Sequence, residues 1–186
     1  MQEGANVLRI LKETKAALEK NDSFTIRGLS NQTINTASLA QDPDNIAVAV
    51  IVYSLSKIVE RLDYRQLPGW KKFYNNALLY LDKSIKDIEG KNYEKFREDF
   101  KMIRGSIENL SGKLKKYVKE VLRNAEISKA SRIYEHGISM EQTANLLGVS
   151  LYELADYVGK TGIADVPENY TRNTKSRIKL AMEMFE

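Results

Sequence analysis

The segment ISMEQTANLLGVSLYELADYVGKTG, residues 138–162, carries the most specific structural pattern in the chain. Ser139 is followed three residues later by Gln142, and Ser150 is followed in the same way by Glu153. Each pair is a capping box, in which the two side chains satisfy free backbone amides at the start of a helix. The two short helices that follow from this are 140–147 and 151–158.

The residues around these starts indicate how the two helices meet. Gly148 can end the first helix in a left-handed conformation, and the small Ala144 lies four residues before it, where two helices approach each other. Apolar side chains at fixed offsets supply a shared core: Leu147, Val149, Leu154 and Val158. A small residue, a glycine four positions later and apolar residues beyond it are typical of a helix-turn-helix motif.

Residues 132–163 resemble the helix-turn-helix of small prokaryotic antitoxins. The family pattern V-S-x-x-E-F/L, seven further residues and G-I corresponds here to Val149, Ser150, Glu153, Leu154, Gly162 and Ile163. Members pair with PIN-type ribonuclease toxins and some bind their own operator, so the resemblance implies a toxin partner and a DNA site.

The chain departs from the antitoxins in two respects. Unrelated helical sequence, residues 1–131, precedes the motif, and a basic segment follows it where an acidic toxin-binding tail would be expected. The fold of the motif therefore carries over more fully than the antitoxin role. The whole chain is also similar to an uncharacterised group of archaeal helical proteins, a similarity that implies no particular chemistry.

The rest of the sequence predicts an all-α protein with an N-terminal helical bundle. Apolar residues recur at helical spacing in four segments: 5–20, 23–40, 44–62 and 70–90. Within the third segment the residues from Ile46 to Leu55 are apolar around the whole helix, which is typical of a central, buried helix. The second segment is unusually polar between Ser30 and Ser38, and such side chains weaken a helix unless tertiary contacts hold them.

The longest apolar pattern runs from Tyr93 to Val121, with spacings of three and four that never slip. It predicts one long helix over 92–123 that packs at a shallow angle and continues through Gly105 and Gly112. A weaker internal similarity links 11–35 to 81–105, since each reads as a helix, a short polar turn and another helix.

The motif predicts contact with double-stranded DNA, but the charge around it is uneven. Residues 110–135 carry seven basic and three acidic side chains, whereas residues 136–170 carry one basic and five acidic. Phosphate neutralisation supplies most of the affinity for DNA, and pairing of arginine with guanine is the commonest specific contact. The second helix of the motif has no basic residue before Lys160, so the cations must come from its flanks.

Two basic flanks and the motif itself supply the candidate contacts. The first flank is one face of a helix and holds Lys116, Lys119 and Arg123. The second flank is the predicted C-terminal helix, with Arg172, Lys175 and Arg177. The motif would present to the groove Asn145, Ser150, Leu151, Tyr152, Asp156 and Lys160.

Two functions remain open, and RNA is an alternative to DNA as the nucleic acid that the motif contacts. In the first, the protein is a homodimeric DNA-binding regulator or antitoxin-like repressor, with 1–125 as the dimerisation or partner-binding bundle and 126–186 as the helix-turn-helix unit. In the second, a degenerate HEPN-like bundle carries a motif that docks another protein through Leu151 and Tyr152. Basic flanks that converge beside Tyr152 would favour DNA, and an apolar patch there would favour a protein partner.

Composition argues against an enzyme. The 186 residues carry a net charge of +4, with no cysteine and one histidine, so thiolate metal sites and cysteine nucleophiles are excluded. HEPN ribonucleases use an Arg…His motif, but here Arg27 precedes Asn31 and no histidine comes before His136, which we expect at a helix end. No phosphate loop or metal cluster stands out, and we expect no catalytic residue, cofactor or metal.

We expect a cytoplasmic protein. The first twenty residues are charged and helix-patterned, without the apolar core of a signal peptide. The longest apolar run, residues 46–55, is about half the length that a membrane-spanning helix needs.

Overall fold

The computed structural model describes residues 1, 3–40, 42–110, 112–135, 138–147 and 149–161. The all-α prediction is confirmed, since every regular element in these residues is helical. The elements in chain order are α1 (Gly4–Glu19), α2 (Ser23–Ala40), α3 (Pro43–Glu60), the short 3-10 helix η1 (Leu62–Gln66), α4 (Trp70–Glu89), α5 (Tyr93–Glu108), α6 (Gly112–Glu135), α7 (Met140–Leu147) and α8 (Leu151–Thr161). None of the helices in the described ranges is both long and apolar enough to cross a lipid bilayer.

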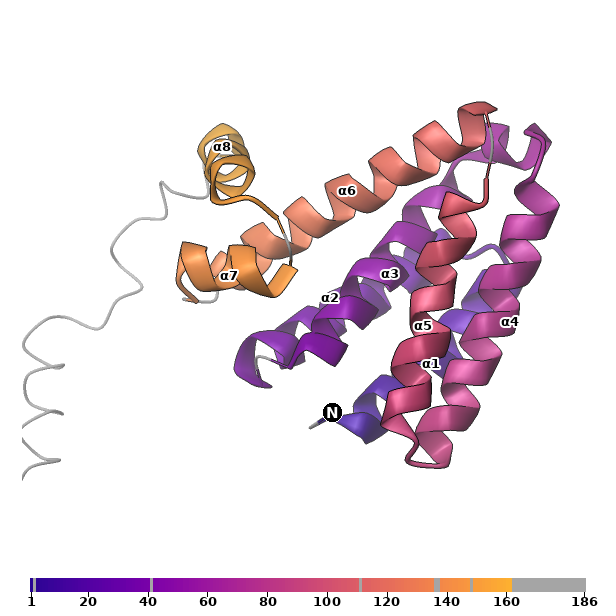
Figure 1. The fold of residues 1–186 in the computed structure, drawn as a ribbon, viewed down its shortest axis with the longest axis horizontal. Coiled ribbons are helices and arrows are strands. Elements are labelled where there is room, and N and C mark those ends of the chain that lie inside the picture. Colours follow the sequence, from indigo (N-terminus) through magenta and orange to yellow (C-terminus); the bar gives the residue numbers. More distant parts are fainter. Residues whose placement is uncertain (2, 41, 111, 136–137, 148, 162–186) are drawn as a thin grey trace, which may run out of the picture.

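The first five α-helices form a bundle, and α6 leads from one end of it to α7 and α8 (Figure 1). Helices α1 and α4 lie side by side and are joined by ion pairs from Lys12 to Glu89 and from Lys15 to Asp82. Because the lower-numbered lysine pairs with the higher-numbered acid, the two helices run in opposite directions. Helices α2 and α3 pack against the side of α6, so α6 belongs both to the bundle and to the C-terminal unit.

Helix α3 is the buried centre of the bundle, as its apolar sequence predicts. Val48, Ala49 and Val52 have no exposed surface. The helix is capped by Asp42, whose carboxylate accepts a hydrogen bond from the Asp44 backbone amide at 2.9 Å. A carboxylate at this position accepts a hydrogen bond from an amide that has no partner within the helix. The start of α3 can therefore be buried without leaving that amide unsatisfied.

The internal similarity between 11–35 and 81–105 corresponds to two helical hairpins with the same turn. The α1–α2 turn places Asn21 at φ +56°, and the α4–α5 turn places Lys91 at the same angle. In each turn the next amide donates back into the preceding helix, from Asp22 to the Ala17 carbonyl and from Asn92 to the Asp87 carbonyl. One helical hairpin, α1–α2, thus precedes α3 in the chain, and a second with the same turn geometry, α4–α5, follows it.

The prediction of a single long helix over 92–123 is wrong. Helix α5 ends at Glu108 and α6 begins at Gly112, whose φ of +61° is left-handed and interrupts helical geometry. The apolar spacing continues through the break because Leu110, in the connection, stays buried against the bundle. The apolar pattern shows only which side chains are buried. A glycine that tolerates positive φ lets the backbone turn between α5 and α6 without changing that pattern.

The C-terminal unit is a three-helix arrangement of the second half of α6, α7 and α8. Its core is a separate cluster of buried side chains: Ala130, Ala144, Val149, Leu154 and Val158. The predicted helix bounds 140–147 are confirmed, and the second helix extends to Thr161, three residues beyond the prediction. Helix α6 runs straight through the expected division at 125/126, so the bundle and this unit share one helix.

Candidate nucleic-acid interface

The two predicted capping boxes place the starts of α7 and α8. The Gln142 amide donates to Ser139 Oγ at 3.2 Å, and the Glu153 amide donates to Ser150 Oγ at 3.1 Å. The Ser150 amide in turn donates to Glu153 Oε2 at 3.1 Å, which completes the second box. Between the helices, the Val149 amide donates to the Ala144 carbonyl at 3.1 Å, the bond that closes a helix C-terminus. Gly148 itself lies outside the described residues.

The first turn of α8 is the most open part of this unit. Tyr152 is 82% exposed and Leu151 is 51% exposed, and no other large apolar side chain in the described part of the chain is as exposed as Tyr152. On α7, Asn145 is exposed as well. In helix-turn-helix proteins the N-terminal residues of the second helix contact base edges, and Leu151 and Tyr152 lie at these positions on α8.

The Arg123 side chain near this turn is engaged in ion pairs. Its guanidinium donates to Glu153 Oε2 at 2.5 Å and to Glu126 Oε2 at 3.1 Å, which fastens α8 to α6. Hydrogen bonds from Arg123 and from Ser150 lower the pKa of Glu153 to about 2. Arg123 thus ties α8 to α6, and its contact with DNA stays a prediction.

Lys116 and Lys119 remain available on α6. Both are exposed, and within the described residues neither has a carboxylate within ion-pair distance. They share a face with Arg123, because residues three and four apart in a helix lie on the same side. Since Arg123 contacts α8, this lysine face leads along α6 to the first turn of α8, over about 10 Å at 1.5 Å per residue.

The other charges predicted to contact DNA divide into two groups. Lys160 donates to Asp156 at 2.6 Å, one helical turn away on α8, so the two charges cancel locally. The tail residues Arg172, Lys175 and Arg177 lie outside the described residues, as does His136. Of the two basic flanks, the structure thus places the one on α6 beside the motif.

Sequence reasoning missed a buried lysine on α6. Lys129 on α6 is 2% exposed; its ammonium lies 4.2 Å from the centre of the Tyr53 ring and donates to Asn31 Oδ1 at 3.1 Å. Burial lowers its pKa to about 8. Its position in the sequence could have predicted the burial, since Lys129 lies one helical turn after the buried Ala125 and therefore on the same side of α6.

The described residues offer no metal site, since no three acidic or imidazole groups among them lie together in a suitable arrangement. Comparison of the chain with protein-family models, with curated proteins and with solved structures finds no match.

Acid should loosen α8 through Glu153. Because the pKa of Glu153 is about 2 in the folded protein and ordinarily near 4.5, its ion pair with Arg123 stabilises α8 at neutral pH. That stabilisation is lost as pH falls from about 4.5 to about 2. We expect the protection factors of the α8 amides, measured by NMR relative to the intrinsic exchange rate at each pH, to fall over this range more than those of α4.

The substitution Glu153→Gln isolates the contribution of this carboxylate. Glutamine also completes a capping box, so the variant keeps the helix start and loses the charge. In E153Q the protection factors of the α8 amides should be lower at pH 6 and should change less with pH, whereas Glu141→Gln, at an exposed position on α7, should behave like the parent protein. Equal acid sensitivity in the parent and E153Q would contradict this role of the ion pair.

Proposed function

We propose that this protein is a helix-turn-helix DNA-binding protein that acts as a transcriptional regulator or antitoxin-like repressor. The observation that supports this most directly is the exposed first turn of α8, with Tyr152 at its tip, at the end of the Lys116 and Lys119 face of α6. A groove-reading turn beside exposed cations is the combination that binding to a duplex requires.

The acidic character of α8 is less of an obstacle than its sequence suggests. Its two carboxylates on the side of the first turns, Glu153 and Asp156, are each paired with a cation of the chain. These pairs offset the repulsion that a phosphate backbone would otherwise meet. Lys116 and Lys119 are then left to contact phosphates, and Asn145 and Tyr152 are left to contact base edges.

The proposal includes a homodimer. One helix-turn-helix reads a few base pairs and binds weakly, and two linked copies gain affinity and a fixed half-site spacing. In this proposal the bundle supplies the dimer contact, because α8 must stay exposed to reach the groove.

A protein-docking role for the same surface is the second candidate. Leu151 and Tyr152 are adjacent, apolar and exposed, as are the anchors of many protein interfaces. The resemblance of 132–163 to antitoxins that pair with PIN-type toxins points in the same direction. In this alternative α8 binds a protein, and the lysine face of α6 has no specific ligand.

Fluorescence anisotropy of the full chain with labelled duplex DNA separates the two candidates. The probes are a duplex from the region upstream of its own gene and a duplex of random sequence, each titrated from low to physiological salt. We expect tighter binding to the upstream duplex. In the double variant Lys116→Gln/Lys119→Gln, the slope of log K against log salt should fall by about 4 for the dimer, because each protomer loses two phosphate contacts and each contact accounts for about one unit.

The matched control is Lys83→Gln/Lys91→Gln, which removes two exposed lysines from α4 and the turn after it. Its salt slope should equal that of the parent protein. If neither duplex binds at low salt, the DNA proposal fails and the docking surface is the better account. If the two double variants lose affinity equally, the binding is unspecific attraction to a basic protein.

A further inference from the structure

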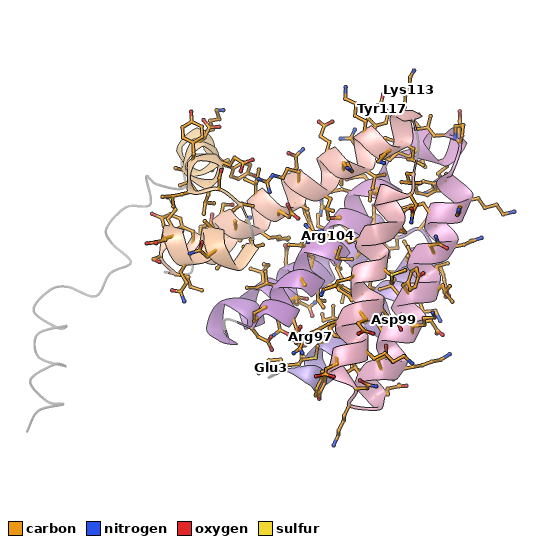
Figure 2. All side chains as sticks on the ribbon, in the orientation of Figure 1. Glu3, Arg97, Asp99, Arg104, Lys113 and Tyr117 are labelled. Atoms are coloured by element: carbon orange, nitrogen blue, oxygen red, sulfur yellow. The ribbon has the colours of Figure 1, made fainter. Side chains whose placement is uncertain are left out.

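A pocket lies where the bundle meets the C-terminal unit. Helices α3, α5, α6 and α7 all line it, and its cavity volume is about 130 Å³. Figure 2 shows Arg104 reaching from α5 toward this junction, where α3 and α6 lie close to each other. The pocket is distinct from the exposed turn of α8, none of whose residues lines it.

The wall that α3 and α5 provide is apolar. Ile46, Val50 and Ile51 line it from α3, and Phe100 lines it from α5. From α7, Leu147 adds the side nearest the helix-turn-helix. A dry protein cavity of about 150 Å³ accepts benzene, so this volume suits an apolar body of about one six-membered ring.

The polar wall carries an excess of positive charge. Glu126 lines the pocket, is buried, and forms ion pairs with Arg104 and with Arg123. Lys101 also lines the pocket, and no carboxylate within the described ranges lies at ion-pair distance from it. Among the residues that line the pocket, one carboxylate thus faces two cations, Lys101 and Arg104, which favours an anion as the missing partner.

The arginine at this wall can accept a second acid. A guanidinium has five N–H donors in a planar fork, and one carboxylate occupies at most two of them. The Arg104 side chain lines the pocket and is 55% exposed, so donors not engaged with Glu126 are accessible to a ligand.

We propose that this pocket binds a small monocarboxylic acid whose apolar body is about the size of one ring. Arg104 and Lys101 hold the carboxylate, and the body lies against α3 and Leu147. The site stands independently of the proposed DNA function, since it uses none of the residues assigned to DNA contact. A ligand seated here touches both the bundle and α7.

NMR of the full chain with isoleucine, leucine and valine methyl groups labelled tests the site, with benzoate as the probe. Benzoate should shift the methyl signals of Ile46, Val50 and Leu147, whereas those of Ile26 and Leu29 in α2, which do not line the pocket, should stay in place. Benzamide has the same ring and no charge. It should bind about tenfold more weakly, because hydrogen bonds to a charged group are the stronger ones.

Two variants and one control complete the test. Ala47→Leu places a larger side chain at the pocket wall from an exposed position, so it should abolish the benzoate shifts without unfolding α3. Arg104→Gln should weaken benzoate about tenfold and leave benzamide unchanged. The control Ala16→Leu enlarges an exposed alanine on α1, away from the pocket, and should bind benzoate as the parent does.

Three results would overturn the proposal. The first is the absence of methyl shifts with benzoate at about 10 mM, which is about the highest dissociation constant that a specific pocket of this size would show. The second is equal affinity for benzoate and benzamide. The third is unchanged benzoate binding by Ala47→Leu. Because the readout is a methyl shift at the pocket, failure here leaves the DNA proposal untouched, and failure of DNA binding leaves this test valid.

Discussion

Replacing Leu154 by alanine should unfold α7 and α8 while the bundle keeps its structure. Leu154 has no exposed surface and belongs to the small core of Ala130, Ala144, Val149 and Val158. Truncating a buried leucine costs about 2–5 kcal/mol, from lost apolar burial and the cavity left behind. A core of so few side chains has little stability in reserve, whereas the bundle has its own, larger core around α3.

Hydrogen exchange followed by mass spectrometry measures this directly. In Leu154→Ala the peptides of α7 and α8 should lose protection, and those of α1, α3 and α4 should keep it. Leu151→Ala is the matched control, because Leu151 lies on the same helix and is half exposed. Uniform loss of protection in the whole chain would mean that the bundle and the helix-turn-helix fold as one unit.

Replacing Lys129 by methionine should make the protein more stable at neutral pH. Burial lowers the pKa of Lys129 from 10.5 to about 8, which corresponds to a cost on the order of 3 kcal/mol for keeping the charged form inside the fold. Methionine has a similar length and no charge. Part of the gain is offset by loss of the Tyr53 ring contact and the Asn31 hydrogen bond, so we expect a net increase of about 1–2 kcal/mol in the free energy of unfolding.

The pH dependence gives this prediction a distinctive signature. Between pH 8 and 10.5 the unfolded chain binds the Lys129 proton and the folded chain releases it, so the stability of the parent protein should rise over this range. Lys129→Met lacks that rise, and its advantage should shrink from neutral pH to pH 10.5. Urea unfolding at pH 7 and pH 10 measures both effects.

The control for the lysine substitution is Lys119→Met, at an exposed position on the same helix. It should change the free energy of unfolding by less than about 0.5 kcal/mol at either pH, as is usual for surface substitutions. If Lys129→Met is less stable than the parent at pH 7, the ring and amide contacts outweigh the cost of burying the charge.

The parts of the fold that the sequence predicts well are those where local pattern and burial agree. The apolar run in α3 predicts a central helix, and the serine-glutamate spacing at 150 and 153 predicts the start of α8; both are confirmed. The break between α5 and α6 was missed, because Leu110 keeps the apolar spacing while Gly112 turns the chain. Periodicity records which side is buried and does not record whether the backbone is continuous.

The candidate site was predictable in position and less so in its charges. The exposure of Leu151 and Tyr152 follows from their phase on α8. The pairing of Arg123 with Glu153 joins residues thirty positions apart, and it depends on how α8 packs on α6, which a sequence pattern does not describe. The pocket around Arg104 is even harder to predict from the sequence, because it forms only where four helices meet.

In the proposed function, α8 and the lysine face of α6 contact DNA. The most direct test is an NMR titration of the full chain with the upstream duplex, read residue by residue. We expect the largest changes at Asn145, Leu151 and Tyr152 and at the Lys116 and Lys119 amides, with little change in α1 and α4. Changes confined to the bundle, or no change at low salt, would contradict the claim.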